Sequence, residues 1–149
     1  MTEARADDMH AKAQIAEVMC TYAHAIDSRD FDLLASCFTE DMRWTVTGTK
    51  IEREDLGTFL ERQGPVLGRF RLTQHMMSTP RISLDEPEAS GVFYALATHI
   101  MLADGKRVTV GVRYDETFAH ADGRWRIRSH VVTSLWSDDD GKMLRGLRD

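Results

Sequence analysis

The sequence is poor in cysteine and proline, and it contains no long apolar run. Two cysteines among 149 residues give no disulfide framework of the kind found in small secreted domains. No apolar stretch approaches the roughly 18 residues that a membrane-spanning helix needs, and the polar N-terminus lacks the apolar segment of a secretory signal. We therefore expect a cytoplasmic protein with no membrane partner.

An excess of basic residues is also missing. The formal net charge is −5, whereas nucleic-acid binding usually requires a basic face. The nearest basic run is "GRWRIRSH", in which arginines alternate as on one face of a strand. We predict no nucleic-acid partner, and the length is typical of one domain over residues 1–149.

Helical patterns fill the first half of the chain. Apolar residues recur at spacings of three and four from Asp8 to Ile26, which predicts an amphipathic helix with Tyr22 on its buried stripe. Asp30 is a plausible N-cap for a second, short helix. The pattern over 53–67 predicts a third helix, interrupted near Gly64 and Pro65. Both cysteines fall within these apolar patterns and are expected to be buried.

Strand patterns dominate the second half. A short strand is predicted over 42–48, and four long ones over 69–85, 89–106, 107–123 and 124–136, joined by turn signals. Gly91 and Gly111 interrupt two of them and predict bulges that curl the sheet. Helices followed by long antiparallel strands predict an α+β fold, in which a curved sheet wraps the helices and leaves a pocket.

Several families of enzyme sites are absent from the sequence. It contains no closely spaced histidine and carboxylate motif for zinc, no phosphate-binding loop, no dinucleotide fingerprint and no nucleophile elbow. We predict no metal and no cofactor. The remaining chemistry is acid–base catalysis by tyrosine, aspartate and histidine.

Four residues raise the question of such a site. His75, His99 and His130 each lie within a predicted strand and are flanked by apolar residues, although each taken alone could be a satisfied core histidine. Asp27 ends the first helix, where the helix dipole disfavours a carboxylate. It either orients a buried imidazole or caps the next helix together with Asp30.

The chain resembles the SnoaL-like branch of the nuclear transport factor 2-like superfamily. The resemblance rests on "YAHAIDSRDFDLLASCFTEDMRWTVTG", "TQHMMSTP", "RYDETFAHADGRWRI" and "SLW". It implies a cone-shaped α+β barrel, with three N-terminal helices packed in a curved, mostly antiparallel sheet. The superfamily includes scytalone dehydratase, bile-acid 7α-dehydratase, hexachlorocyclohexane dehydrochlorinase and ketosteroid isomerase.

The resemblance also implies roles for particular residues. Asp27 and His75 match the Asp–His dyad of these lyases, and Tyr22 matches a tyrosine five residues before the aspartate. His99 matches the approximate place of a second pocket histidine, and His130 falls near a last-strand arginine of the dehydrochlorinase. The predicted catalytic residues are Tyr22, Asp27, His75 and His99. The predicted substrate-binding residues are Trp44, Phe59, Met77, Phe93, His130 and Leu135.

Two classes of function follow from this interpretation. The first is a cofactor-independent lyase, with an isomerase or cyclase as its variant, acting on a small apolar carbonyl-containing ring compound such as a steroid, polyketide or terpenoid. His75 would remove a proton, Asp27 would orient the imidazole, and Tyr22 would donate a hydrogen bond. The second is a non-catalytic ligand-binding and dimerisation module on the same fold. In either case, the family suggests a homodimer or homotrimer.

Overall fold

The computed structural model describes residues 3–78 and 80–145. In chain order its elements are α1 (Glu3–Ser28), α2 (Phe31–Ser36), β1 (Phe38–Val46), α3 (Leu56–Leu67), β2 (Phe70–Met77), β3 (Arg81–Asp85), β4 (Glu88–Met101), β5 (Arg107–Ala121), β6 (Arg124–Ser137) and α4 (Lys142–Arg145). None of the described helices is long and apolar enough to cross a bilayer.

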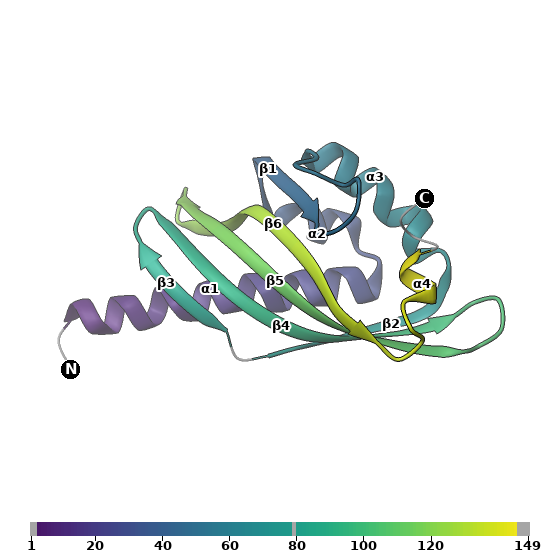
Figure 1. Ribbon diagram of the computed structural model, residues 1–149. Helices are drawn as coiled ribbons and strands as arrows, with labels where there is room; N and C mark the ends of the chain where they lie inside the picture. Colours follow the sequence, from purple (N-terminus) through teal and green to yellow (C-terminus); the bar gives the residue numbers. More distant parts are fainter. Residues whose placement is uncertain (1–2, 79, 146–149) are drawn as a thin grey trace.

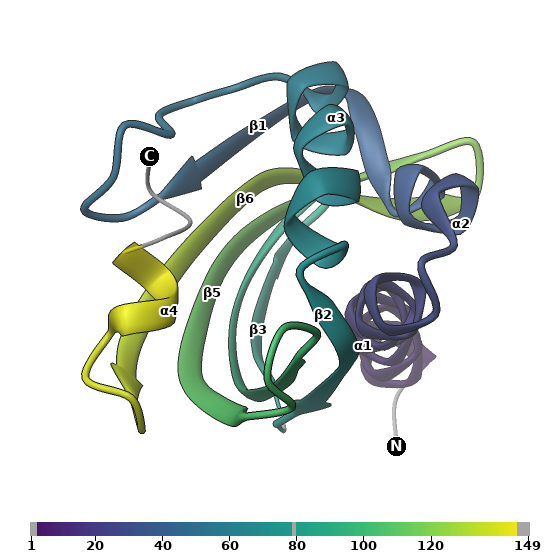
Figure 2. The ribbon, with the colours of Figure 1, turned by 90° about the vertical axis from the view of Figure 1, so that its right-hand side faces the viewer.

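The strands form one curved, mixed sheet of six. The order is β1-β6-β5-β4-β2, and β3 pairs with β4 beside β2. The β1–β6 pair is parallel, and the other pairs are antiparallel. The sheet curls around α1 and α3, while α4 lies beside the end of β6 (Figures 1 and 2). The predicted α+β cone is confirmed.

The helices begin and end where short-range signals place them. Asp30 caps α2 by accepting a hydrogen bond from the Leu33 amide, and Asp55 caps α3 by accepting one from Thr58. Helix α3 runs through Pro65 without the predicted interruption. Pro65 has no amide hydrogen for the Glu61 carbonyl, yet the helix continues past it, and the Gly68 amide bonds the Gly64 carbonyl at 2.9 Å.

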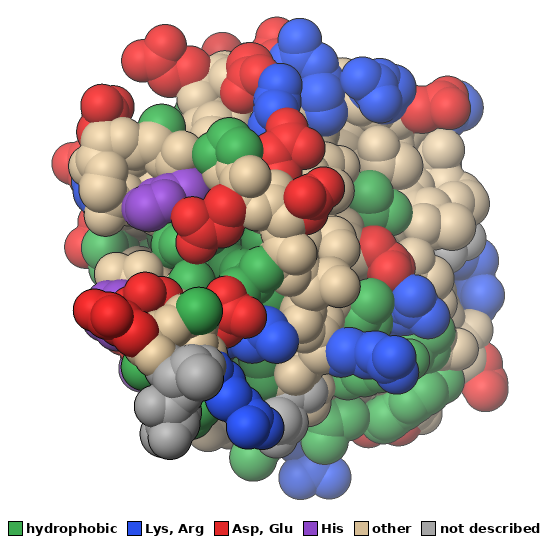
Figure 3. Space-filling model, turned by 90° about the vertical axis from the view of Figure 1, so that its left-hand side faces the viewer, with side chains coloured by type: hydrophobic (Ala, Val, Ile, Leu, Met, Phe, Trp, Pro, Cys, Tyr) green, Lys and Arg blue, Asp and Glu red, His purple; other side chains and the backbone are tan. Residues whose placement is uncertain are grey.

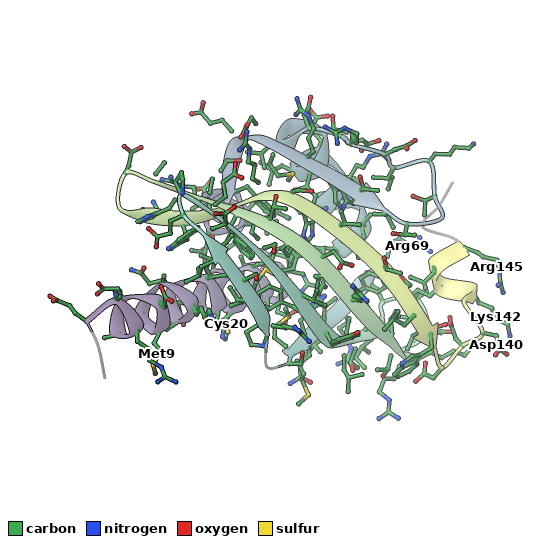
Figure 4. The ribbon with its side chains drawn as sticks, turned by 60° about the vertical axis from the view of Figure 1, so that its left-hand side comes forward. Met9, Cys20, Arg69, Asp140, Lys142 and Arg145 are labelled. Atoms are coloured by element: carbon green, nitrogen blue, oxygen red, sulfur yellow. The ribbon has the colours of Figure 1, made fainter. Side chains whose placement is uncertain are left out.

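Two other local predictions are wrong. The candidate strand over 69–85 is two strands, β2 and β3, which pair with successive parts of β4. Cys20 is exposed, because it lies on the face of α1 that turns away from the strands (Figure 4). Cys37 is buried, as predicted.

Bulges in β6 decide which of its residues face the concave side. Before the first bulge the buried residues are odd-numbered, Trp125 and Ile127. Ser129 pairs with Thr117 but Ile127 pairs with Phe118, so Arg128 is an extra residue. The extra residue reverses the alternation, and His130 therefore becomes fully buried.

Of the two glycines that were expected to mark bulges, only Gly111 lies at one. A register shift does lie between Gly111 and Val112. A side chain at Gly111 would collide with the Trp136 indole, which packs over it. At Gly91 the pairing with β3 and β5 continues without a shift, so that prediction is wrong. The rings of Phe93 and Phe118 occupy the space beside Gly91 instead.

Charges of both signs are spread over the surface. Figure 3 shows acidic and basic side chains on the same face of the molecule. Several form ion pairs, such as Arg128 with Glu88 at 2.9 Å and Arg62 with Glu54 at 2.9 Å. The arginine row predicted on β6 therefore takes part, at least at Arg128, in pairing with acidic neighbours.

Candidate active site

Asp27 and His75 form a hydrogen-bonded pair between the end of α1 and the middle of β2. The Asp27 Oδ1 atom lies 2.7 Å from the His75 Nδ1 atom, and Oδ2 accepts the His75 backbone N–H at 2.8 Å. The Thr73 hydroxyl donates to Oδ1 at 2.9 Å. The predicted hydrogen bond between Asp27 and His75 is therefore confirmed, and their catalytic roles stay predictions.

Arg29 explains how a carboxylate is accommodated at the end of a helix. Its backbone has a φ of +56°, a left-handed conformation that ends α1. Its guanidinium donates to the Asp27 carbonyl at 2.8 Å and to the Phe70 carbonyl at 3.3 Å. The cation therefore offsets the partial negative charge of the helix end, while the Asp27 side chain is free to turn to β2. Of the two alternatives for Asp27, the structure shows the imidazole partner, whereas Asp30 caps α2.

These contacts fix the protonation of the pair. Burial by itself raises the pKa of Asp27, but the hydrogen bonds from His75 and Thr73 outweigh it, so the pKa lies below its usual value. An ionised Asp27 requires a hydrogen on Nδ1 of His75. In the neutral ring, Nε2 then carries a lone pair and is able to accept a proton.

A cavity of about 200 Å³ lies on the concave side of the sheet, and His75 lines it. Its buried end includes Tyr22, Phe59, Tyr114 and His130. Two residues of α4, Met143 and Leu144, also line it. Figure 4 labels three charged residues in or next to α4, namely Asp140, Lys142 and Arg145. No lysine, arginine, aspartate or glutamate occurs among the described residues that line the cavity.

Most of the residues predicted for the site meet at this cavity. Those that line it are Tyr22, Trp44, Phe59, His75, His99 and His130. Asp27 lies behind His75 and is 23% exposed at its side chain, against 9% for His75. Asp27 therefore contacts the imidazole and does not line the cavity itself.

Three predicted substrate-binding residues do not line the cavity. Phe93 packs against Phe118, at ring centroids 6.0 Å apart, in the buried core further along β4. Met77 shares a strand face with His75 but lies one step past it, partly buried against the core. Leu135 is 50% exposed, because it is the extra residue of a second bulge that pairs Ser134 with Val112 and Trp136 with Gly111. Ser134 lines the cavity in its place.

His99 lies beside the dyad. Its ring centroid is 6.2 Å from that of His75, and its Nδ1 atom is buried without a hydrogen-bond partner. Burial, with the charge of His75, lowers the pKa of His99 to about 4. His99 is therefore neutral at pH 7.

Tyr22 is held among aromatic rings. Its ring contacts Tyr114 at 5.8 Å and His130 at 5.0 Å between centroids. Burial, with Tyr114 and Glu116 nearby, raises the pKa of Tyr22 well above its usual value. The Tyr22 hydroxyl therefore keeps its hydrogen.

Tyr114 and Glu116 are site residues that were not predicted. Both lie on the inward face of β5, and Glu116 is bonded to His130. A signal was present, since Tyr114, Glu116 and Phe118 alternate in a strand whose inward face is otherwise apolar. Over 3–78 and 80–145, no group of three or more histidine, cysteine, aspartate or glutamate side chains is placed to hold a metal ion.

Comparison with known proteins agrees with the fold and identifies the family. A model of the SnoaL-like domain matches residues 7–131. An uncharacterized protein of Mycobacterium tuberculosis is 28% identical over 133 residues, which cover 84% of this chain and 86% of that protein. A solved hexachlorocyclohexane dehydrochlorinase, LinA type 2, superposes with a TM-score of 0.80 at 18% identity, covering 89% of this chain and 90% of that one. A candidate scytalone dehydratase of Novosphingobium aromaticivorans superposes with a TM-score of 0.76 at 24% identity, covering 93% and 91%.

The cone of helices and curved sheet thus places the molecule in the nuclear transport factor 2-like fold, whose solved members include dehydratase and dehydrochlorinase types. The chain belongs to the SnoaL-like domain family.

Proposed function

We propose that the protein is a cofactor-independent lyase that removes water from a small, uncharged carbonyl-containing ring compound. The observation that carries the proposal is the 2.7 Å hydrogen bond between Asp27 and His75 at the wall of an apolar cavity. An ionised carboxylate on Nδ1 raises the basicity of Nε2, and Nε2 is the ring nitrogen left for a ligand. The pair therefore has the arrangement of a general base.

The reaction begins with proton abstraction. The Nε2 atom of His75 takes a proton from the carbon next to the carbonyl, and the electrons of that C–H bond move toward the carbonyl and give an enolate. When the C–O bond to a hydroxyl on the next carbon breaks, the carbonyl forms again and a C=C bond joins the two ring carbons. The leaving hydroxide departs as water with the proton that His75 carried, so the imidazole returns to its starting state. Positioned acid–base catalysis contributes about 10²–10⁴-fold to such a reaction.

The walls of the cavity favour an uncharged, compact ligand. Valine, isoleucine and aromatic side chains predominate among the lining residues, and the described lining contains no lysine, arginine, aspartate or glutamate. Apolar walls with a few placed polar groups are typical of small-molecule sites. This lining offers no lysine or arginine to bind the phosphate of a sugar phosphate.

Elimination is preferred to double-bond isomerisation because of the superposed structures. Both reactions begin with the same proton transfer, but the solved relatives carry the names dehydrochlorinase and dehydratase. We carry over the reaction class and not their substrates.

The test is a dehydration assay with β-hydroxy cyclic ketones. We would use 3-hydroxycyclohexanone, which loses water to an absorbing enone, and 3-hydroxy-1-tetralone, which loses water to fluorescent 1-naphthol. We expect wild-type protein to accelerate at least one of them over buffer, and His75→Ala to remove the acceleration. Ring ketones that raise the melting temperature but lose water no faster than in buffer would favour a non-catalytic binding module.

We also propose a homo-oligomer that forms through the convex face of the sheet. Met76 pairs with Leu96, Leu96 with Gly111, and Gly111 with Trp136, so one apolar row crosses β2, β4, β5 and β6. Met76, Leu96 and Trp136 are 62%, 45% and 51% exposed. Adjacent exposed apolar side chains of this kind mark interaction surfaces, and a second copy of the same curved sheet is a self-complementary partner.

A further inference from the structure

A second carboxylate–imidazole pair lies at the buried end of the same cavity. The Glu116 Oε1 atom of β5 is 2.7 Å from the His130 Nδ1 atom of β6, and the two residues are directly paired across the strands. Neither side chain has any exposed surface. Ionisable groups are seldom buried so completely, because removing a charge from water is costly unless it is paired.

The imidazole of His130 is held in one orientation. Tyr114 stacks on it, with centroids 5.5 Å apart and planes 14° from parallel. Tyr22 and Phe59 contact it with their ring edges at 5.0 and 5.8 Å. With Nδ1 bonded to Glu116, only Nε2 remains for another partner.

That Nε2 atom has no hydrogen-bond partner in the protein. It is buried, as is the unpaired Oε2 atom of Glu116, and the His130 ring lines the cavity. An unpaired buried polar atom costs about 1–3 kcal/mol. A group retained at that cost beside a cavity is explained if a ligand atom supplies the missing partner.

Counting protons shows what kind of partner Nε2 requires. The pair is neutral if Glu116 is ionised and both ring nitrogens carry hydrogens, or if Glu116 is protonated and bonds to Nδ1. In both arrangements Nε2 carries a hydrogen. A bare Nε2 would require either an anionic pair, which the negative charge of Asp115 disfavours, or a carboxyl hydrogen on Oε2, which has no hydrogen-bond partner.

The electrostatics of the site agree with the neutral pair. Burial raises the pKa of Glu116, although the charge of His130 and their hydrogen bond act against it. At the Asp27–His75 pair the pKa of the carboxyl shifts in the opposite direction. The pKa of Asp27 is lowered, because its carboxylate accepts three hydrogen bonds. The two pairs therefore have opposite polarity, with Nε2 of His75 an acceptor and Nε2 of His130 a donor.

We propose that Nε2–H of His130 donates a hydrogen bond to the carbonyl oxygen of the substrate, and that Glu116 is a positioning residue that keeps this nitrogen protonated. The inference rests on the proposed function, since it assigns the electrophilic side of the same reaction. His75 takes the proton from carbon while negative charge grows on the carbonyl oxygen, and His130 stabilises that charge without giving up its hydrogen. Strands β5 and β4 lie between β6 and β2 in the sheet, so the curvature of the sheet sets the donor and the base on different walls of one cavity.

The first test needs no substrate. In protein labelled with ¹⁵N-histidine, long-range ¹H–¹⁵N spectra report which ring nitrogen carries a hydrogen, and the His130 signals are assigned by their loss in H130Q. We expect Nε2 of His130 to be protonated at pH 7, because the proposed hydrogen bond to a carbonyl oxygen requires a donor at this nitrogen. A bare Nε2 at pH 7 would overturn the proposal.

The second test uses 1-tetralone, a ring ketone with no leaving group. Its carbonyl stretching frequency, measured by infrared difference spectroscopy with a ¹³C label, should fall when it binds wild-type protein or His75→Gln. The double variant Glu116→Leu and His130→Phe keeps apolar rings in the site and leaves no buried charge. We expect it to bind 1-tetralone about tenfold more weakly and to show no such fall. The same carbonyl frequency in wild type and the double variant would contradict the proposal, even if the protein is folded and active.

These readouts separate the two proposals. A protonated Nε2 and a shifted carbonyl, without any dehydration of hydroxy ketones, would leave the donor assignment in place and remove the lyase. Dehydration that depends on His75, with a bare Nε2 on His130, would leave the lyase in place and remove the donor.

Discussion

Asp27 holds His75 at two points, its ring and its backbone. One carboxylate oxygen lies 2.7 Å from Nδ1, and the other accepts the amide hydrogen of the same residue at 2.8 Å. This double contact joins the end of α1 to β2, so the imidazole is oriented by the two elements that meet there. A general base requires this kind of fixed geometry.

Substitutions of His75, Asp27 and Tyr22 should differ in their effect on turnover. His75→Ala removes the base and should lower the rate by about 10²–10⁴-fold. Asp27→Asn should lower it less, because an amide still bonds the ring but does not stabilise an imidazolium. Tyr22→Phe should be mildest, at about 1–3 kcal/mol for one lost donor. Steady-state kinetics with a hydroxy ketone that the wild-type protein dehydrates would give the order.

Two exposed residues provide matched controls for these variants. His24 and Asp32 lie outside the cavity on α1 and α2, and His24→Ala and Asp32→Asn should keep wild-type turnover. Equal activity of wild type, His75→Ala and Asp27→Asn would remove the general-base assignment.

Thr73 should keep the Asp27 carboxylate ionised. Its hydroxyl donates to Oδ1 at 2.9 Å, so Thr73→Val, which has nearly the same shape, should raise the pKa of Asp27 toward its usual value. Titration of the carboxyl ¹³C signal in both proteins measures the change directly. Turnover should fall about three- to tenfold, as expected for one hydrogen bond. An unchanged Asp27 pKa would show that the His75 contacts alone set it.

Protonation of His99 should weaken the fold in acid. Its pKa is about 4 in the folded protein, against 6.5 for a solvated histidine. Between these values the unfolded chain binds a proton that the folded protein excludes, so the free energy of unfolding should fall as the pH is lowered from 6.5 to 4. The loss is up to about 3 kcal/mol.

Urea denaturation of wild type and His99→Gln over this pH range measures the loss. The glutamine variant lacks the titrating group, so its stability should depend less on pH. Asp27 destabilises both proteins alike when it is protonated in acid, and the difference between the two curves isolates His99. Parallel curves would show that His99 is protonated in the folded state.

Gly111 should be intolerant of a side chain. An added Cβ would collide with the indole of Trp136, so Gly111→Ala should destabilise the fold by about 1–3 kcal/mol. Adding Trp136→Ala should restore much of that loss, because it vacates the space. Gly64→Ala in α3, where nothing lies within 4 Å, serves as the control and should not destabilise, as measured by urea denaturation.

A charge on the convex face should dissociate the proposed oligomer. Leu96 lies in the apolar row, and Leu96→Lys should yield monomers in light scattering coupled to size exclusion. Leu102 is 62% exposed but lies beyond the end of β4, so Leu102→Lys should keep the wild-type mass. A monomeric wild-type protein would contradict the proposal at once.

Local signals in the sequence predicted the elements better than the site. The apolar stripe of α1, the N-cap at Asp30 and the turns between strands depend on neighbouring residues, and they are found where expected. The pairing of Asp27 with His75 spans 48 residues, and the resemblance to a family supplied it rather than any spacing. Its only local trace was a carboxylate at a helix end.

The bulges were the main source of error at the cavity. In a strand without bulges, side chains alternate between the two faces, so His130 and Leu135 would lie on opposite faces of β6. The extra residues Arg128 and Leu135 change this alternation, so that His130 faces the cavity and Leu135 does not. A bulge depends on the partner strand and on rings such as Trp136, which no single strand pattern contains. Glu116 was overlooked for a related reason, since a carboxylate between Tyr114 and Phe118 is interpretable only once His130 is known to face it.

Hydrogen–deuterium exchange tests the central claim, that His75 is a general base, most directly. In D₂O, 1-tetralone exchanges the protons on the carbon beside its carbonyl, and ¹H NMR follows their loss. We expect wild-type protein to accelerate this exchange by about 10²-fold or more over buffer, and His75→Gln to return it to the rate in buffer. Equal exchange rates with wild type and His75→Gln would contradict the account.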